Sequence, residues 1–387
     1  MYHLKAIIIG AGIGGLTTGI ALKQAGYEIE IYDKVREFRP AGAGISLWSN
    51  GIKVLNQLGL GEEIAQMGGR MNQMEYRSHQ DKLLNSIDLH PLINEVGQRP
   101  YPVARTDLQA LLLQAVGEEN VTLNCKCVKV SEEKDGITAT FEDGRTTRGD
   151  LLISADGIHS IIRPVVTGES SEPRYAGYVN WNGLVEANRQ EIDPECWVIY
   201  VGEGKRASMM PIGKDRFYFF FGCPMEKGTE VAPENRQQEL AEIFQEWPSP
   251  VQRLIETLNP LETNRLEIHD LNPLNTLVKG RIALLGDAGH ATTPTLGQGG
   301  CQAMEDAAVL CRYLVTTNVS VEDALQRYEL ARKPRTSELV LKARKRTDTI
   351  YGKDMSVTQE WYKSLSQESE SDVINALAKV ILAGPFN

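Results

Sequence analysis

The stretch AIIIGAGIGGLTTGIALKQAGYEIEIYD, residues 6–33, decides the fold of this chain. Its β-branched run at residues 6–9 is typical of a buried parallel strand. Residues from about 16 to 24 favour a helix that ends at Gly26, and residues 28–32 favour a second strand. A strand, a glycine-rich turn, a helix and a strand in this order predict the βαβ unit of a Rossmann-like α/β domain.

Three glycines in this unit fit the pattern G-x-G-x-x-G. Gly10 allows the tight turn, Gly12 lets the backbone approach a pyrophosphate, and Gly15 lets helix and strand pack closely. Asp33 ends the second strand, where a carboxylate accepts hydrogen bonds from an adenosine ribose and repels a 2′-phosphate. The unit therefore predicts bound FAD or NAD rather than NADP. A tight turn that binds nothing is the plain alternative.

A second candidate site lies in residues 281–306, RIALLGDAGHATTPTLGQGGCQAMED. The apolar run at residues 282–285 predicts a buried strand, after which Asp287 emerges. The glycine-rich residues 297–300 precede a helical pattern, and backbone N–H groups at a helix start attract electron-rich atoms. The stretch predicts a ligand with hydroxyls at one end and hydrogen-bond acceptors at the other. An ordinary glycine turn before a helix is the alternative.

Composition limits the possible functions. The 387 residues allow a large α/β unit and a second domain. The formal net charge of −10 disfavours binding to nucleic acid or to an anionic membrane. No apolar run approaches the roughly 20 residues of a membrane helix. The six cysteines show no C-x-x-C spacing, which indicates reduced thiols of a cytoplasmic protein and no metal site.

Changes of pattern along the chain predict three parts. A mostly antiparallel β-sheet domain that binds the substrate is inserted into the nucleotide-binding domain, and the C-terminus is helical, so the fold is a mixed α/β (α+β) one. The basic run Lys342, Arg344, Lys345 and Arg346 is interpreted as a solvated helix face without a function. The nucleotide-binding domain comprises residues 1–70, 101–172 and 264–340, the sheet domain 71–100 and 173–263, and the helical segment 341–387.

Residues 206–212 and 216–221 are strand-like and form a hairpin. A three-residue loop, 213–215, puts the even-numbered residues of both strands on one face, whereas a two-residue loop, 214–215, puts the arginine and the first tyrosine on opposite faces. A cation beside a phenol suits a flat anionic ring. An ordinary sheet with one exposed arginine is the alternative. The face formed with the longer loop contains Arg206, Ser208, Met210, Tyr218 and Phe220.

Two other segments are candidates for ligand contact. Arg105 opens a helical stretch, where its charge is unfavourable for the helix dipole, so a ligand that holds it is one interpretation and a surface arginine is the other. Small residues at 42–47 would allow the backbone to approach a flat ring, or they form a plain glycine loop.

The sequence contains three separated motifs that can be compared with known families: GAGIGG with Asp33, DGIHSIIR at residues 156–163, and GDAGHATTPTLGQGG at residues 286–300. Together they resemble the single-component aromatic flavin hydroxylases, the class A FAD-dependent monooxygenases related to para-hydroxybenzoate hydroxylase. Four further runs resemble the FAD-dependent urate hydroxylases within that family. They are RYAGYVNWNGLVE (174–186), VGEGKRASMMPI (201–212), RFYFFF (216–221) and GQGGCQAMEDA (297–307).

The resemblance implies tightly but non-covalently bound FAD and hydroxylation of urate to 5-hydroxyisourate in purine breakdown. NADH would bind transiently, since the sequence has no second G-x-G-x-x-G. The reduced flavin would take up O2 as a C4a-hydroperoxide, which urate would attack. Arg206 and Tyr218 would be the catalytic and urate-binding pair, joined in the substrate site by Asn180 and Gly297. FAD would be held by Gly10, Ala11, Gly12, Gly15, Asp33, Lys34, Ser46, Arg105, Asp156, Asp287, Leu296, Gly297, Gln298, Gly299 and Gly300.

Other functions stay open. Within the same class, the substrate could be another aromatic acid, such as a hydroxybenzoate or hydroxynicotinate, because one arginine also suits a carboxylate. A flavoprotein dehydrogenase that does not use oxygen and a non-enzymatic flavin sensor are the alternatives from other classes. As to assembly, a monomer or a homodimer is expected, with only small-molecule partners.

Overall fold

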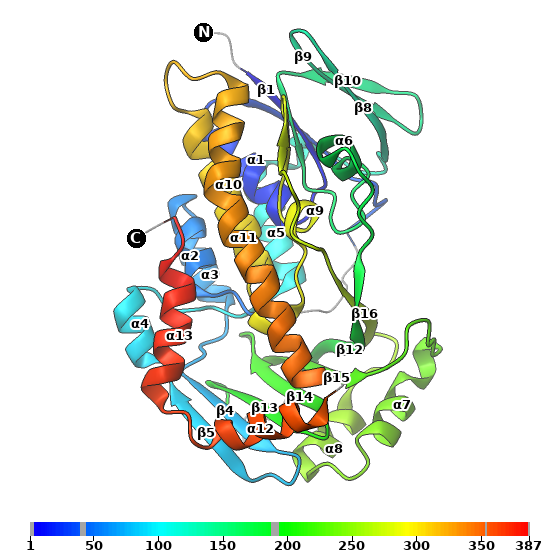
Figure 1. The fold of residues 1–387 in the computed structure, drawn as a ribbon, viewed down its shortest axis with the longest axis vertical. Helices are drawn as coiled ribbons and strands as arrows, with labels where there is room; N and C mark the ends of the chain where they lie inside the picture. The colour runs from blue at the N-terminus through cyan, green and yellow to red at the C-terminus, as the bar shows by residue number, and fades with distance from the viewer. Residues whose placement is uncertain (1–3, 39–43, 187–192, 353, 386–387) are drawn as a thin grey trace.

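The structure, a computed structural model, describes residues 4–38, 44–186, 193–352 and 354–385 (Figure 1). A six-stranded sheet lies in the upper half of Figure 1 and a seven-stranded sheet in the lower half. The long helix α11 (Val321–Tyr351) extends between them, in contact with a strand of each. This arrangement confirms the predicted fold class, a Rossmann-like α/β unit with an inserted, mostly antiparallel sheet.

The six-stranded sheet is built on the βαβ unit predicted at residues 6–33. Its first strand is parallel to the second on one side and to the strand at residues 151–154 on the other. The connecting helix α1 (Ile13–Gln24) begins earlier than predicted, because the chain turns helical directly after Gly12. The strands in spatial order are β17 (Val278–Lys279), β18 (Ile282–Leu284), β11 (Leu151–Ser154), β1 (Lys5–Ile9), β2 (Glu28–Tyr32) and β7 (Val121–Thr122).

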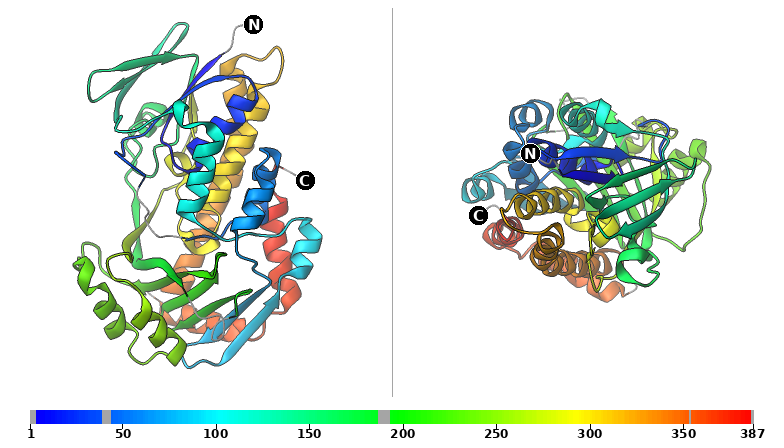
Figure 2. Two further views of the ribbon diagram at one scale, coloured as in Figure 1. Left: turned by 180° about the vertical axis from the view of Figure 1, so that it is seen from behind. Right: turned by 90° about the horizontal axis from the view of Figure 1, so that it is seen from above.

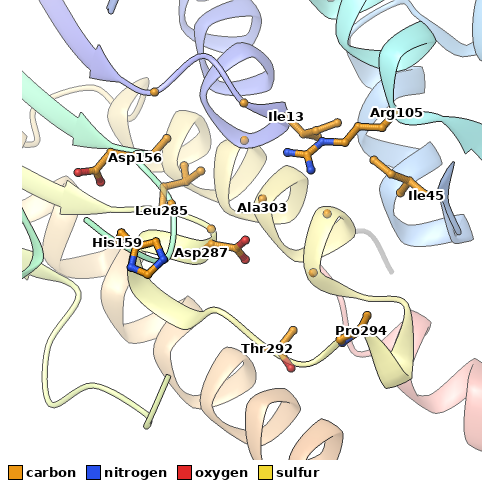
Figure 3. Close-up of a pocket in the computed structure, with 18 of the residues that line it drawn as sticks. Ile13, Ile45, Arg105, Asp156, His159, Leu285, Asp287, Thr292, Pro294 and Ala303 are labelled. Atoms are coloured by element: carbon orange, nitrogen blue, oxygen red, sulfur yellow. The ribbon is translucent and has the colours of Figure 1, made fainter. Parts of the chain in front are cut away.

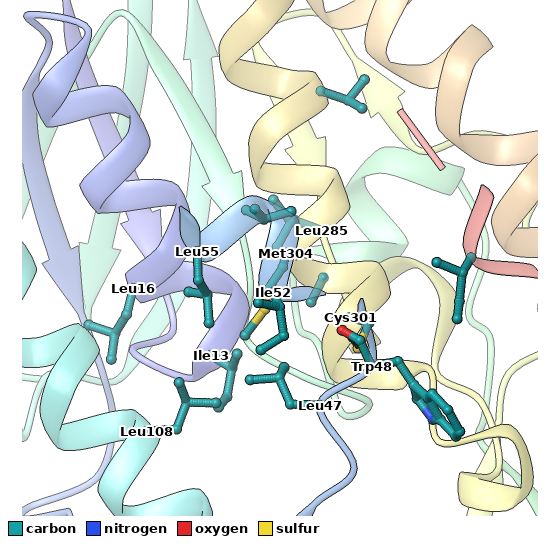
Figure 4. Close-up of a cluster of buried hydrophobic side chains, with 14 of the residues drawn as sticks. Ile13, Leu16, Leu47, Trp48, Ile52, Leu55, Leu108, Leu285, Cys301 and Met304 are labelled. Carbon is teal, nitrogen blue, oxygen red and sulfur yellow. Dashed lines mark hydrogen bonds between the residues drawn. The ribbon is translucent and has the colours of Figure 1, made fainter. Parts of the chain in front are cut away.

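Four helices bury one apolar cluster beside this sheet (Figure 4). They are α1, α2 (Ser49–Gln57), α5 (Arg105–Val116) and α10 (Gly299–Leu314). Complete burial of such side chains contributes roughly 1.5–3 kcal/mol each, which fixes the helix ends relative to the sheet. Members of the cluster include Ile13, Leu16, Ile52, Leu55, Leu108 and Met304.

The seven-stranded sheet is antiparallel apart from the parallel pair β4–β13. Two of its strands lie within residues 71–100, which the sequence analysis assigned to the sheet domain. The strands in spatial order are β16 (Asn264–Asp270), β12 (Arg174–Glu186), β15 (Arg216–Pro224), β14 (Lys205–Pro211), β13 (Cys196–Gly202), β4 (Gln73–Ser78) and β5 (Leu83–Asp88).

The aromatic strand β15 divides its side chains between two environments. Phe217, Phe219 and Phe221 are buried in a core that includes residues of α7 (Arg236–Ile243) and α8 (Ser249–Thr257). Tyr218 and Phe220 alternate with them and therefore face the opposite side of the sheet. One face of β15 thus anchors the two helices, which leaves the other face for a site.

A separate three-stranded sheet lies between β7 and β11 in the chain, whereas residues 121–122 join the six-stranded sheet as β7. All six cysteines, which lie among the described residues, are unpaired thiols. The remaining elements are β8 (Cys127–Glu133), β9 (Gly136–Phe141), β10 (Thr146–Gly149), β3 (Gly44–Ile45), β6 (Val103–Ala104), α3 (Gly61–Met67), α4 (His90–Val96), α6 (Arg163–Thr167), α9 (Asp287–His290), α12 (Met355–Leu365), α13 (Glu370–Leu382), and 3-10 turns at Glu118–Asn120, Pro233–Asn235 and Pro294–Leu296.

Two proposed domain boundaries conflict with the elements. Residues 264–270, which the sequence analysis assigned to the nucleotide-binding domain, form β16 and pair with β12 in the substrate sheet. The boundary at residue 340 falls inside α11, a continuous helix. Strand alternation and helical spacing show elements, but not which sheet a strand joins or where a helix contributes to two domains.

The interpretation of residues 342–346 as a solvated face is wrong for two of its members. The guanidinium of Arg344 forms two hydrogen bonds to the fully buried carboxylate of Asp270, at 3.0 Å each. That of Arg346 lies over the ring of Trp361, 4.6 Å from its centre. This side of α11 is therefore covered by β16 and by α12, which lies near the base of the ribbon in Figure 1 and in the left view of Figure 2. None of the helices in the described ranges has the length and apolar character needed to span a membrane.

Candidate active site

A cavity of about 590 Å³ extends from the glycine turn after β1 to the inner face of the seven-stranded sheet. Its wall includes residues of both sheets and the starts of α1, α5 and α10 (Figure 3). Of the candidate site residues, it is lined by Gly10, Gly12, Asp33, Lys34, Ser46, Arg105, Asp156, Asn180, Arg206, Tyr218, Asp287, Gly297, Gly299 and Gly300. The structure thus brings together residues that are up to 290 positions apart.

The three glycines of the G-x-G-x-x-G turn are glycine for different reasons. A Cβ on Gly10, which has φ of +108°, would lie 2.2 Å from the carbonyl oxygen of Ala155, and one on Gly15 would lie 1.9 Å from that of Gly10. A Cβ on Gly12 would meet no atom of the described residues within 4 Å and would project into the cavity. Protein packing explains two of the glycines, whereas the third leaves room for a ligand at the start of α1. This is the arrangement that a pyrophosphate requires.

Asp33 is held at this end of the cavity by backbone donors. Its Oδ2 accepts a hydrogen bond from the amide of Ala11 at 2.7 Å, and its Oδ1 accepts one from the amide of Val35 at 3.0 Å. Each carboxylate oxygen keeps a lone pair for a ribose hydroxyl. Ala11 does not line the cavity, so its contribution in the structure is to orient Asp33.

Arg105 and Asp287 lie on opposite sides of the middle of the cavity (Figure 3). Asp287 begins α9, and its side chain is open to the cavity but surrounded by protein on the other sides. This burial raises the pKa of its carboxyl group, while His290 and Arg105 act in the opposite direction. Arg105 opens α5, as predicted, and points into the cavity. A cation facing an acceptor suits a ligand segment that carries both phosphate and hydroxyl groups.

The predicted glycine-rich loop supplies backbone rather than side chains. α10 begins at Gly299, and Gly297 has φ of +63°, with space for a Cβ blocked by Ser46 Oγ at 2.4 Å. The side chain of Gln298 is buried and accepts a hydrogen bond from Asn50 at 3.0 Å. Gln298 and Leu296 are not among the residues that line the cavity, so the structure does not place these two candidate residues at the ligand space.

A buried charge network below this loop was missed by the sequence analysis. Arg332, 1% exposed, donates to Asp306 and to Glu305, at 2.6 Å each. Asp306 also accepts from the amide of Gly286, and its Oδ2 lies 2.6 Å from His290 Nε2. Burial opposes ionisation of Asp306, but His290 and Arg332 lower its pKa to about 2. The network fixes α9 and α10, the two helices that border the middle of the cavity.

The DGIHSIIR motif forms another part of the wall. The carboxylate of Asp156 accepts hydrogen bonds from Ser154 Oγ at 2.6 Å and from the amide of Ile161 at 3.1 Å. Asp156 and His159 border the cavity (Figure 3), while Arg163 is buried and donates to the carbonyl of Ala288. Arg163 therefore connects this motif to α9, whereas Asp156 and His159 are side chains of the motif at the cavity.

The hairpin has the three-residue loop that places Arg206 and Tyr218 on one face. The amide of Ile212 donates to the carbonyl of Arg216 at 3.0 Å, and Met210 lies opposite Tyr218. The alternative with a two-residue loop is wrong. Of the predicted face only Ser208 does not reach the cavity; instead its hydroxyl accepts from Trp197 Nε1 at 2.6 Å.

Asn180, Gly222 and Arg206 form one row across three neighbouring strands. A Cβ on Gly222 would lie 2.1 Å from the hydroxyl oxygen of Tyr351, so the glycine makes room for this phenol between the other two side chains. Tyr351 stacks on Tyr178 with ring centres 4.0 Å apart. Both tyrosines line the cavity and were missed, since nothing in the sequence relates the end of α11 to β12.

Arg206 is available to a ligand. It is 5% exposed, and its Nε has no hydrogen-bond partner among the described residues. Its guanidinium carbon lies 5.1 Å from the ring centre of Phe220. Burial raises the pKa of the Tyr218 phenol, which is therefore neutral at physiological pH. A Cβ on Gly44 would lie 2.4 Å from Cγ of Tyr218. The backbone does approach a flat ring there, but the ring is a protein side chain; residues 42 and 43 lie outside the described ranges.

Comparisons with known proteins show the family of this chain. The model of the FAD binding domain family matches residues 3–343. The FAD-dependent urate hydroxylase of Klebsiella pneumoniae is 47% identical over 99% of this chain and 100% of its own length, and that of Mycolicibacterium vanbaalenii is 46% identical over 99% and 98%. The crystal structure of Klebsiella pneumoniae HpxO complexed with FAD and uric acid has a TM-score of 0.96 and 46% identity, with coverage of 99% of this chain and 98% of that one. The resemblance is confirmed, and the chain belongs to the FAD-binding family that includes the FAD-dependent urate hydroxylases.

Proposed function

We propose that this protein is an FAD-dependent urate hydroxylase that uses NADH and O2 to form 5-hydroxyisourate. The observation that carries the proposal is one continuous cavity. It joins a dinucleotide turn at Gly12 to a pocket lined by Arg206 and Tyr218, which lie on the same face of the hairpin. The close relatives support urate as the substrate. Among the described residues no cluster of ligands for a metal ion occurs, and the proposed reaction requires none.

The cavity residues fit FAD along its length. The open space at Gly12 suits the pyrophosphate, and Asp33 suits the adenosine ribose. Arg105 and Asp287 would hold the middle of the cofactor, with the backbone of residues 297–300 at the flavin. Bound FAD supplies the transfer of electrons from NADH and the activation of O2. NADH would visit only transiently, because the chain has a single G-x-G-x-x-G turn.

The pocket residues would bind and orient urate, which is an anion at neutral pH. Arg206 would donate charge-assisted hydrogen bonds to it. The neutral phenol of Tyr218 would orient the ring by a hydrogen bond or by ring contact, with Asn180 and Gly297 at its edges. Met210 and Phe220 would keep water from the reacting atoms. The exclusion of water limits the unproductive formation of H2O2. Because urate is electron-rich at C5, no strong base is needed from the chain.

The test is NADH oxidation by the purified protein, with and without urate, while the ultraviolet absorbance of urate is followed. We expect urate to accelerate NADH use and to disappear one for one with it, with stoichiometric use of oxygen. Urate that accelerates NADH use but persists while H2O2 appears would make it an effector, and a panel of aromatic acids would then identify the substrate. Turnover without oxygen would point to a dehydrogenase.

The role of Arg206 is tested by Arg206→Ala. We expect more H2O2 per NADH and weaker urate binding, with FAD still bound. Arg216→Ala is the matched control, because this arginine belongs to the same hairpin but donates to Asp107 at 2.6 Å and does not line the cavity. Tight coupling and normal urate affinity in Arg206→Ala would contradict the role.

A further inference from the structure

Three asparagine side chains form a hydrogen-bonded chain that ends at the cavity. Asn264, the first residue of β16, donates from Nδ2 to Oδ1 of Asn182 at 3.1 Å. Asn182 donates from Nδ2 to Oδ1 of Asn180 at 2.8 Å. Asn180 and Asn182 point to the same face of β12, and both are buried, 6% and 5% exposed. Of the three, only Asn180 lines the cavity.

These hydrogen bonds determine which end of the Asn180 carboxamide faces the cavity. A carboxamide has an acceptor end and a donor end of nearly the same shape, so its polarity is set by its neighbours. Because the oxygen of Asn180 accepts from Asn182, the NH2 group is the end that remains for a ligand. Arg206, in the same row across Gly222, has only donors. Both ends of this row therefore present N–H groups.

We propose that Asn182 and Asn264 are positioning residues that fix Asn180 as a hydrogen-bond donor, so that the pocket selects a ring with an acceptor oxygen at that point. The inference rests on the proposed function and deepens it, because urate offers carbonyl oxygens around its rings. The wrong polarity would set an acceptor against an acceptor and leave both unpaired. Such a mismatch weakens binding by about 10- to 100-fold.

Asn264→Asp tests the inference from outside the cavity. A carboxylate only accepts hydrogen bonds. Asn182 would therefore turn its NH2 group to the new carboxylate and its oxygen to Asn180, and Asn180 would turn its oxygen to the cavity. Asn264 is half-buried, so the charge keeps access to water. We expect the Kd and KM of urate to rise about 10-fold or more, with FAD affinity unchanged.

A reversed polarity of the Asn180 amide also predicts tighter binding of a different class of ligand. A purine in which an amino group replaces the oxygen that faces Asn180 should bind Asn264→Asp more tightly than it binds the wild type. Titration of the flavin spectrum with urate and with a set of such aminopurines measures both changes. A variant that loses urate and gains no analogue of the set contradicts the inference, since general damage would weaken all ligands.

Asn182→Leu provides the matched control, because leucine has a similar shape and cannot transmit polarity. In this background Asn264→Asp should have no further effect on urate. An undiminished effect would show that the charge acts through space and would overturn the inference, as would an unchanged Kd in the single variant Asn264→Asp. A wild type that fails to bind urate overturns the proposed function and this inference together. Wild-type binding with unaltered variants overturns the inference alone.

Discussion

Gly12→Ala and Gly15→Ala should separate cofactor binding from folding, although both lie in the same turn. Gly12 has φ of −76° and ψ of −176°, which alanine adopts freely, and its Cβ would touch none of the described residues. Alanine also restricts the unfolded chain, worth about 0.4–1 kcal/mol of stability. The flavin-free form of Gly12→Ala should therefore unfold at or slightly above the wild-type temperature.

Gly12→Ala should instead weaken the binding of FAD. The new methyl group would occupy the space that the pyrophosphate needs next to the start of α1. A hydrogen bond to a charged group contributes about 1.5–3 kcal/mol. Loss of one such bond raises the Kd of FAD by about 10- to 150-fold.

Gly15→Ala should have the opposite pattern: it should destabilise the flavin-free protein rather than weaken the binding of FAD. Its Cβ would lie 1.9 Å from the carbonyl oxygen of Gly10, about 1.5 Å closer than the 3.4 Å of ordinary contact. Overpacking costs about 1–3 kcal/mol, and a backbone oxygen cannot rotate away, so the upper end applies. The better helix propensity of alanine offsets at most about 1 kcal/mol. At about 2.1 cal/mol/K of unfolding entropy per residue, the remaining 2 kcal/mol lowers the Tm by about 2–3 °C.

The assay is thermal unfolding of the flavin-free proteins beside titration of each with FAD, followed by flavin fluorescence. Wild type provides the reference for both. The reasoning is refuted if Gly12→Ala lowers the Tm of the flavin-free protein as much as Gly15→Ala does, or if it keeps the wild-type Kd for FAD.

Three other substitutions test the pocket and the buried network. Gly44→Ala should push the ring of Tyr218 aside and raise the KM of urate about 3- to 10-fold with FAD retained, as steady-state kinetics and the flavin spectrum will show. Arg332→Met removes the guanidinium from two buried carboxylates and should cost about 3–5 kcal/mol in urea unfolding. Because His290 and Arg332 overcome the effect of burial and hold the pKa of Asp306 at about 2, its ionisation stabilises the fold by about 2 kcal/mol above pH 4, and this is lost as the pH falls toward 2. Urea unfolding from pH 6 to 3 should therefore depend less on pH in Asp306→Asn.

The sequence was sufficient to predict those parts of the site that depend on local backbone geometry. The glycine turn, Asp33 after β2 and the helix start at Gly299 are each encoded in about 30 neighbouring residues, and the structure has them as predicted. The shared face of Arg206 and Tyr218 also followed from local rules, once the loop had three residues. Strand alternation then fixes every side chain in the pair.

The sequence was insufficient where contacts depend on how distant elements pack. Tyr351 ends a helix that otherwise shows a mixed pattern, and only the packing of α11 on β12 brings it beside Tyr178. Arg332 and Arg344 looked like ordinary charges on a helix, yet both bind buried carboxylates. A charged residue in a helix is usually solvated, so its sequence context does not reveal a buried partner elsewhere in the chain.

Glycine shows why a sequence and a structure answer different questions about the same residue. Gly12, Gly44 and Gly222 all border the cavity or its side chains, and each looks equally permissive in the sequence. In the structure, Gly44 makes room for the ring of Tyr218 and Gly222 makes room for the hydroxyl of Tyr351, so both shape the protein's own pocket. The space at Gly12 is filled by no described residue, which makes it the position where the need for glycine comes from the ligand. A turn that needed glycine only for its own conformation would have left no such space at the start of a helix.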